Sequence, residues 1–165
     1  RIGYRIGEGQ AVEARSTAAI AIFSSLLLAI FGALLIYLFR DPMIQLYTEE
    51  NNVVQLARQL LMFVVFFLIF DATQSTAIGT LRGYKDTQVP MKIALVSYWV
   101  IGLPLGCTLG FGWLAPPLEV YGFWIGLAAG VGCASILLCY RLFRLSGDPV
   151  LIRSLSATAD PEPAP

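Results

Sequence analysis

Asp71 is the residue of this 165-residue sequence whose position most strongly suggests chemistry. It lies near the middle of a long apolar stretch, and it is the only acidic residue inside such a stretch. A carboxylate deep in a bilayer costs several kcal/mol unless it is protonated, paired or bound to a cation. Two interpretations follow: Asp71 is a proton or Na⁺ site facing a cavity, or it is a neutral carboxyl that joins two helices structurally.

Polar and aromatic residues near Asp71 are candidates for lining a substrate cavity. Gln74 and Ser75 follow Asp71 by three and four residues, which places them on the same helix face. Tyr98 and Trp99 lie well inside the next apolar stretch, away from its ends. Their rings could stack on a flat aromatic cation, or they could equally face lipid or a neighbouring helix.

Proline and glycine mark two further features of the apolar stretches. Pro104 lies in the sequence GLPLG, and it removes a backbone donor, so a helix kink is expected there. Kinked helices often line transporter cavities, but such a kink can also serve packing alone. Gly122, Gly126 and Gly130 recur every four residues and predict close packing against another helix, in this chain or another.

Several other kinds of chemistry are not expected. The sequence has no histidine, and its three cysteines lie in apolar stretches without a CxxC pair, so a zinc site or another metal cofactor is not predicted. Neither a phosphate-binding glycine loop nor a nucleophile arrangement is found, so an enzyme is not expected. The formal net charge of 0 gives no reason to expect a nucleic-acid partner.

The elements that must position these residues are membrane-spanning helices. Hydrophobic residues make up 57% of the chain and charged residues 13%, well below the quarter or so that soluble domains carry. Each apolar stretch is long enough, at about 1.5 Å per helical residue, to cross a hydrocarbon core of about 30 Å. The sequence therefore predicts an all-α polytopic membrane protein in contact with the lipid bilayer, with spans at about 17–39, 57–81, 90–112 and 120–142.

The segments between the spans predict turns and an orientation. Asp41 and Pro42 predict the start of a short surface helix that ends near Tyr47, and Asp86 indicates a turn residue. The remainder, 146–165, is polar and ends in a proline-rich run, so we expect a disordered cytoplasmic tail. Nine Lys and Arg residues fall on one side of the predicted membrane and two on the other, which predicts a cytoplasmic N-terminal segment and tail.

Three stretches, in this order and spacing, resemble the multidrug and toxic compound extrusion (MATE) family in its bacterial NorM-like branch. They are RIGYRIGEGQAVEAR (1–15), DATQSTAIGTLRGYKDTQVP (71–90), and YWVIGLPLG (98–106) followed by GFWIGLAAG (122–130). The segment LYTEENNVVQLA (46–57) also fits the family. The resemblance covers the chain from its start to about residue 145.

The resemblance implies a multi-pass protein of the bacterial inner membrane, with twelve helices in two six-helix lobes. Residues 1–145 would supply the last four helices of the C-terminal lobe, with the missing N-terminal lobe of the same protein as partner. Members exchange Na⁺ or H⁺ for amphipathic, often cationic drugs, and Asp71 matches an aspartate of the tenth helix that contributes to cation coupling. The family's acidic partner on the seventh helix is absent from this sequence, so we expect a fragment that is inactive alone.

Two other functions remain open from the residues. A lipid or polymer flippase of the same superfamily is one, although an acid and no Lys or Arg at mid-span argue against an anionic lipid substrate. A non-transporting membrane assembly subunit is the other. In that case Asp71 would be structural, and the glycines would form an interface.

Overall fold

The computed structural model describes residues 2–8, 11–113, 116–148, 150–152 and 154–155, and within them every regular element is a helix. The helices are α1 (Ile2–Gly7), α2 (Ala11–Gln45), α3 (Asn51–Gly83), α4 (Gln88–Val96), the π-helix η1 (Ser97–Gly102), α5 (Leu103–Gly110) and α6 (Val120–Ser146). Within these described ranges, four segments are long and apolar enough to cross a membrane: Val12–Gln45, Asn51–Gly83, Gln88–Gly110 and Val120–Ser146. The predicted all-α polytopic architecture is confirmed.

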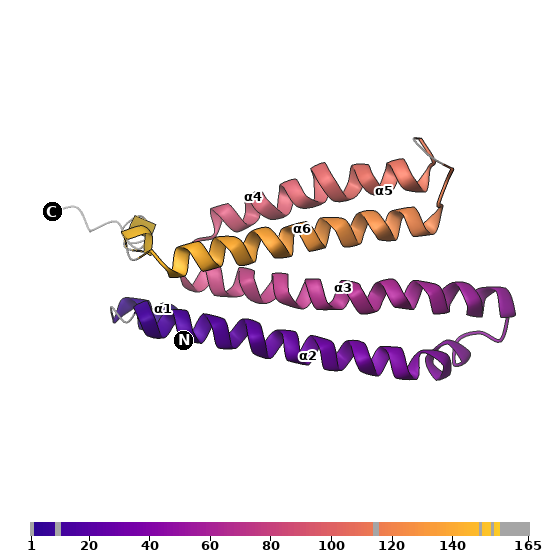
Figure 1. Ribbon diagram of the computed structural model, residues 1–165, viewed down its shortest axis with the longest axis horizontal. Helices are drawn as coiled ribbons and strands as arrows, with labels where there is room; N and C mark the ends of the chain where they lie inside the picture. The colour runs from indigo at the N-terminus through magenta and orange to yellow at the C-terminus, as the bar shows by residue number, and fades with distance from the viewer. Residues whose placement is uncertain (1, 9–10, 114–115, 149, 153, 156–165) are drawn as a thin grey trace.

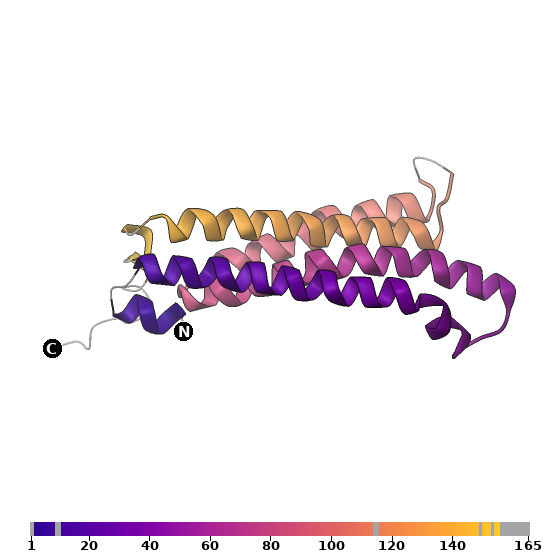
Figure 2. The ribbon, with the colours of Figure 1, turned by 60° about the horizontal axis from the view of Figure 1, so that its bottom comes forward.

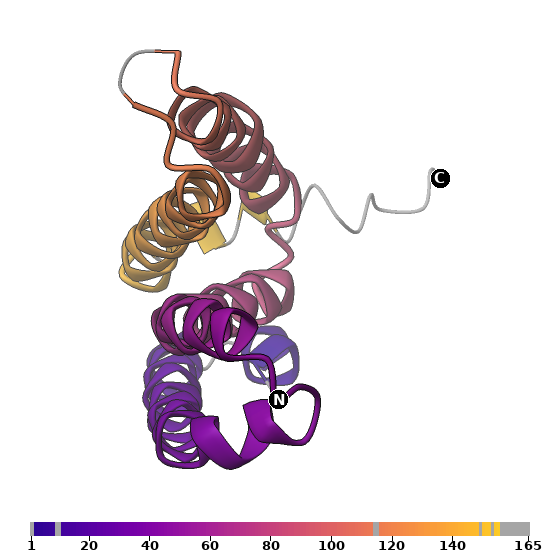
Figure 3. The same ribbon diagram turned by 90° about the vertical axis from the view of Figure 1, so that its right-hand side faces the viewer.

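The four spans lie side by side in a row, and their order in the row differs from their order in the chain. α2 packs on α3 and α3 packs on α6, while the segment from α4 to α5, called the third span below, packs on the far side of α6 (Figure 1). Seen from the end, the row runs from the α4–α5 segment through α6 and α3 to α2, with the helices staggered to either side (Figure 3). The short α1 lies beside the start of α2 and also contacts α3 (Figure 2). α6 is thus a central helix, although it comes last in the chain.

The outer surfaces of the row are apolar, as a membrane span requires. Leu28 on α2 is 72% exposed and Trp99 on η1 is 65% exposed. A helix that is apolar on all faces belongs in a protein core or in lipid. The spans therefore present to the bilayer the side chains that a soluble helix would bury.

α2 does not end where the sequence indicates. The predicted helix after Asp41 is not separate, because α2 continues through Pro42 and ends at Gln45. Proline in a helix forfeits one hydrogen bond to the residue four positions earlier. Pro42 falls in the last turn, so the bond to the Leu38 carbonyl is lost where only three residues of α2 remain to be continued. The Leu46 N–H still donates to the Pro42 carbonyl at 3.2 Å.

The third span changes its winding at mid-length. η1 is π-helical, and the N–H of Leu103 donates to the carbonyl of Tyr98, five residues earlier. Pro104 follows in the first turn of α5 and has no N–H to offer the residues before it. A single π-helical turn inserted in an α-helix is rare and occurs frequently at functional sites.

Paired glycines allow α6 and the third span to touch backbone to backbone. A Cβ added to Gly126 would lie 2.3 Å from the Cα of Gly106, and one added to Gly122 would lie 2.4 Å from the backbone N of Gly110. At the next level a Cβ on Gly130 would lie 3.1 Å from the Cα of Gly102. Both helices repeat glycine every four residues, and their antiparallel arrangement matches the two repeats level by level.

The buried core and the basic residues share one end of the row. The core cluster contains Ala14 and Ala18 of α2, Ala77 and Leu81 of α3 with Tyr84 directly after it, Ala134, Leu138, Leu142 and Leu145 of the second half of α6, and Ile152 beyond it. α2 begins at this end, and α3 and α6 finish there (Figure 1). We call it the basic end, because it carries Arg5, Arg15, Arg82, Lys85, Lys92, Arg141 and Arg144. Among the described residues the opposite end carries only Arg40 and Arg58.

Candidate functional site

α3 carries Asp71 near its middle, between α2 on one side and α6 on the other. The Asp71 side chain is half-buried. The ion pairs in the described ranges join Glu13 to Arg5, Asp41 to Arg40 and Arg58, and Asp86 to Arg141. No cationic side chain of the described chain therefore neutralises the Asp71 carboxylate.

Gln74, one turn after Asp71, connects α3 to the π-helix. Its amide is buried, and Nε2 donates to the Tyr98 hydroxyl at 2.7 Å. The Tyr98 hydroxyl in turn lies 3.0 Å from Gln74 Oε1 and can donate to it. Hydrogen bonds between membrane helices contribute roughly 0.6–2 kcal/mol each. This pair is the polar link between the Asp71 helix and η1.

η1 also holds a buried hydroxyl. Ser97 is completely buried, and no hydrogen-bond partner for its Oγ is found in the described ranges. The Ser97 carbonyl lies 3.1 Å from where a Cβ of Gly130 would stand. The π-helical winding therefore sits against the glycine strip of α6, with little space between the two backbones.

The remaining candidates lie away from the Gln74–Tyr98 pair. Ser75 and Trp99 are exposed on the outer surface of this chain, although each adjoins one of the paired residues in sequence. Pro104 is also exposed. The structure brings together Gln74 and Tyr98, places Asp71 one turn away, and leaves Ser75 and Trp99 apart from them.

A small apolar cavity adjoins this region. It has a volume of about 270 Å³ and lies between the third span and α6. Tyr98, Cys107, Phe123 and Leu127 contribute side chains to its walls, and Gly102 and Gly106 leave space at its floor. Tyr98 thus contacts both the cavity and the amide of Gln74.

Asp86 is a structural residue that the sequence indicates only as part of a turn. It is 2% exposed, and its Oδ2 accepts a hydrogen bond of 2.8 Å from Arg141 Nε, 55 residues later. The turn after α3 is the one local feature of the sequence that marks the position of Asp86. Lys85 has a positive φ of 63°, while the Asp86 N–H reaches back to the Leu81 carbonyl at 3.0 Å. This helix-ending motif directs Asp86 inward.

Apolar spans around one mid-span carboxylate and a π-helical turn define the general class of polytopic helical membrane proteins. A model of the MatE family matches residues 1–108, and the chain belongs to this family. The resemblance noted in the sequence is thereby confirmed.

Relatives with known names support this assignment. The chain is 42% identical over 147 residues to "Multidrug resistance protein NorM" of Vibrio cholerae, covering 88% of this chain and 32% of that protein. It is 39% identical over 145 residues to "Multidrug resistance protein PmpM" of Pseudomonas aeruginosa, covering 87% and 30%. It is 38% identical over 150 residues to "Multidrug resistance protein MdtK" of Cronobacter sakazakii, covering 90% and 33%. The chain spans about a third of the length of these curated relatives.

Proposed function

We propose that the protein containing this chain is a secondary active multidrug efflux antiporter of the bacterial inner membrane. It exchanges Na⁺ or H⁺ for amphipathic, often cationic drugs. The observation that carries the proposal is the half-buried Asp71 carboxylate in α3, for which the described chain supplies no cation. The names of the relatives, all multidrug resistance proteins, support the substrate class.

In this proposal Asp71 is the coupling group. An unpaired carboxylate at mid-span is stabilised either by a proton or by a bound cation such as Na⁺. The coupling ion and the drug must bind the two conformations of the transporter with different affinities, because otherwise neither can shift the equilibrium. Binding at Asp71 and drug binding would therefore alternate rather than coincide.

The Gln74–Tyr98 pair offers a route from Asp71 to a moving element. Gln74 lies one turn from Asp71 on α3, and Tyr98 belongs to the π-helix that precedes Pro104. A change of charge at Asp71 alters the field at the Gln74 amide and so the strength of this interhelical hydrogen bond. Pro104 has no N–H, so η1 is held by fewer backbone hydrogen bonds than a regular helix. We therefore expect the third span to change its conformation when the charge at Asp71 changes.

Drug accumulation in cells that express the complete protein tests the proposal. The variant is Asp71→Asn, which keeps the side-chain shape and removes the titratable charge. We expect low ethidium accumulation with wild type, and accumulation equal to the empty vector with Asp71→Asn, at matched membrane abundance.

A matched control lies two residues away on the same helix. The Thr73 hydroxyl donates to its own helix, to the Ile69 carbonyl at 2.8 Å, so Thr73→Val changes polarity without breaking a link between helices. We expect this variant to export like wild type. Low drug accumulation in cells carrying Asp71→Asn would show that Asp71 is not the coupling group. If cells with the wild-type protein accumulated as much of every drug in a panel as cells with the empty vector, the proposal of drug efflux would be wrong.

A further inference from the structure

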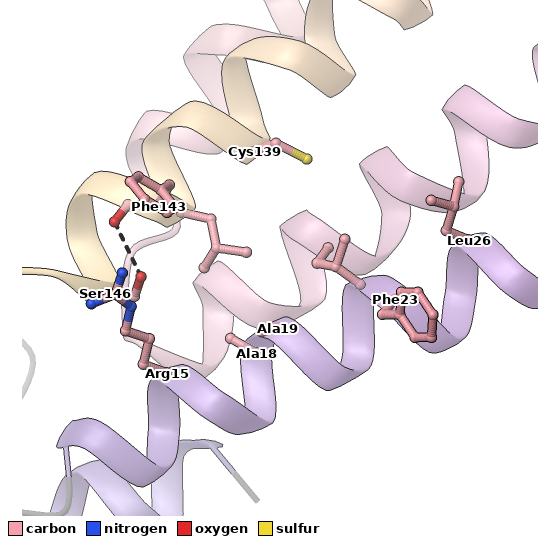
Figure 4. Close-up of a pocket in the computed structure, with 10 residues that line it drawn as sticks. Arg15, Ala18, Ala19, Phe23, Leu26, Cys139, Phe143 and Ser146 are labelled. Carbon is pink, nitrogen blue, oxygen red and sulfur yellow. Dashed lines mark hydrogen bonds between the residues drawn. The ribbon is translucent and has the colours of Figure 1, made fainter.

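A second cavity lies at the basic end, and neither Asp71, Gln74 nor Tyr98 lines it. It has a volume of about 450 Å³ and is formed between the start of α2 and the end of α6 (Figure 4). Its walls are mainly apolar and include Ala19, Ile22 and Leu26 of α2, with Leu142 and Phe143 of α6. We call it the α2–α6 groove.

The groove has the length and surface of an acyl-chain site. Arg15 and Leu26 mark its two ends on α2, and eleven helical residues at about 1.5 Å each span about 16 Å. The long axis of the groove follows the helices and therefore runs along the membrane normal. Along this length its walls are apolar apart from the weakly polar Cys139 thiol, and the strongly polar side chains, Arg15 and Ser146, lie at the basic end.

Arg15 places a positive charge at the mouth of the groove. Its guanidinium carbon lies 5.4 Å from the centre of the Phe143 ring, which holds the side chain over the groove (Figure 4). No carboxylate of the described chain pairs with it. Burial raises the pKa of the Tyr84 hydroxyl, and the Arg15 charge opposes that rise.

We propose that the α2–α6 groove binds one anionic phospholipid, with its phosphate on Arg15 and an acyl chain between α2 and α6. Basic pockets between membrane helices on the cytoplasmic side are sites where anionic headgroups bind. The acyl chain gains little free energy by moving from bulk lipid into the groove, because bulk lipid is as apolar as the groove. The preference must therefore come from the headgroup, and one basic residue near the surface corresponds to about a five-fold preference for anionic over zwitterionic lipid.

The charge of Arg15 also argues for lipid over a protein segment as the occupant. A helix from elsewhere in the protein, or from a second copy, would bury the guanidinium and would have to bring its own anion. A phospholipid supplies the anion and the apolar chain in one molecule. Its phosphate would lie at Arg15 and its acyl chain along the apolar walls toward Leu26. The proposal does not depend on the transport activity of the protein.

Native mass spectrometry of the complete protein tests the proposal. The protein is released from detergent in the presence of equal concentrations of phosphatidylglycerol and phosphatidylethanolamine, and the bound lipids are counted. We expect about a five-fold excess of bound phosphatidylglycerol with wild type and no excess with Arg15→Gln. Arg82→Gln removes an exposed charge at the same basic end and should keep the preference of wild type.

A second pair of variants tests the acyl-chain site. Ala19→Trp fills the groove from an exposed position, while Leu28→Trp adds bulk on α2 outside the groove. We expect bound phosphatidylglycerol to fall with Ala19→Trp and to stay unchanged with Leu28→Trp, each checked for a monodisperse elution profile. Equal binding of the two lipids to wild type overturns the proposal. So does an unchanged phosphatidylglycerol excess with Arg15→Gln, which would place the anionic headgroup on another basic residue. Unchanged phosphatidylglycerol binding with Ala19→Trp overturns it as well, because another protein segment would then cover the groove.

Discussion

Arg141 of α6 and Asp86 of the α3–α4 loop form a buried ion pair, with Arg141 Nε 2.8 Å from Asp86 Oδ2. Asp86 is 2% exposed, whereas the Arg141 side chain keeps 24% of its surface accessible. The pair fastens the loop between the second and third spans to the last turns of the central helix. It therefore fixes the end of α3 and the start of α4 relative to α6.

Removing one partner of this pair should destabilise the fold. Asp86→Asn keeps the shape but leaves the Arg141 charge without its carboxylate, and breaking a buried ion pair in this way costs about 3–5 kcal/mol. Because Arg141 is partly accessible, we expect about 2–3 kcal/mol, seen as a lower melting temperature in detergent.

Asp41→Asn is the matched control for this experiment. Asp41 pairs with Arg58 at 2.9 Å, but both side chains are more than 40% exposed. Exposed pairs contribute about 0–1 kcal/mol, so the melting temperature should hardly change. Equal losses from the two substitutions would mean that the burial of Asp86 does not matter to stability.

Gly126→Ala should disrupt the contact of α6 with the third span. The added Cβ would lie 2.3 Å from both the Cα and the backbone N of Gly106, so the helices must move apart. Overpacking of this kind costs about 1–3 kcal/mol, and the backbone contact favours the upper part of that range. The change is measured as the free energy of unfolding in mixed micelles.

Gly132→Ala, on the same helix, separates the effect of contact from that of helix propensity. A Cβ at Gly132 meets nothing within 4 Å. Replacing a mid-helix glycine with alanine is then expected to be neutral or to stabilise by about 0.5–1 kcal/mol. If Gly126→Ala behaves like Gly132→Ala, the close approach of the two helices is wrong.

The Gln74–Tyr98 hydrogen bond should be measurable in a double-mutant cycle. The single variants Gln74→Leu and Tyr98→Phe each leave one partner of the hydrogen bond unsatisfied, and the double variant removes both partners. Couplings between membrane helices average about 0.6 kcal/mol with a maximum near 1.7 kcal/mol, so we expect about 1 kcal/mol here. A coupling indistinguishable from zero would show that α3 and η1 are not linked through these side chains.

Local patterns predict the helices better than their pairing. Runs of apolar residues are enough to predict four spans, because the length of a bilayer-spanning helix is fixed by the membrane. The glycine repeat of Gly122, Gly126 and Gly130 is also visible in the sequence. The helix that packs against this repeat cannot be predicted from the sequence, because neighbouring helices in the row are not always neighbours in the chain. α6 returns to lie between α3 and the third span.

Features that depend on contacts between distant parts of the chain cannot be predicted from local sequence patterns. Asp86 and Arg141 are 55 residues apart, and only the return of α6 to the basic end makes them partners. Pro42 is a strong helix-breaking signal, yet α2 passes through it and ends only three residues later, at Gln45. For Asp71 the residue type and depth suggest a role, whereas its lack of a cation among the described residues is known only from the fold.

The orientation of the row gives a final prediction. The excess of Lys and Arg at the basic end predicts that this end is cytoplasmic. In a variant without Cys107, Cys133 and Cys139, a cysteine at Arg82 should react with an impermeant maleimide only after the cells are opened. A cysteine at Glu119, in the segment that precedes α6 at the opposite end, should react in intact cells. The reverse pattern would place Arg15 in the outer leaflet, and the lipid that reaches the α2–α6 groove would then come from that side.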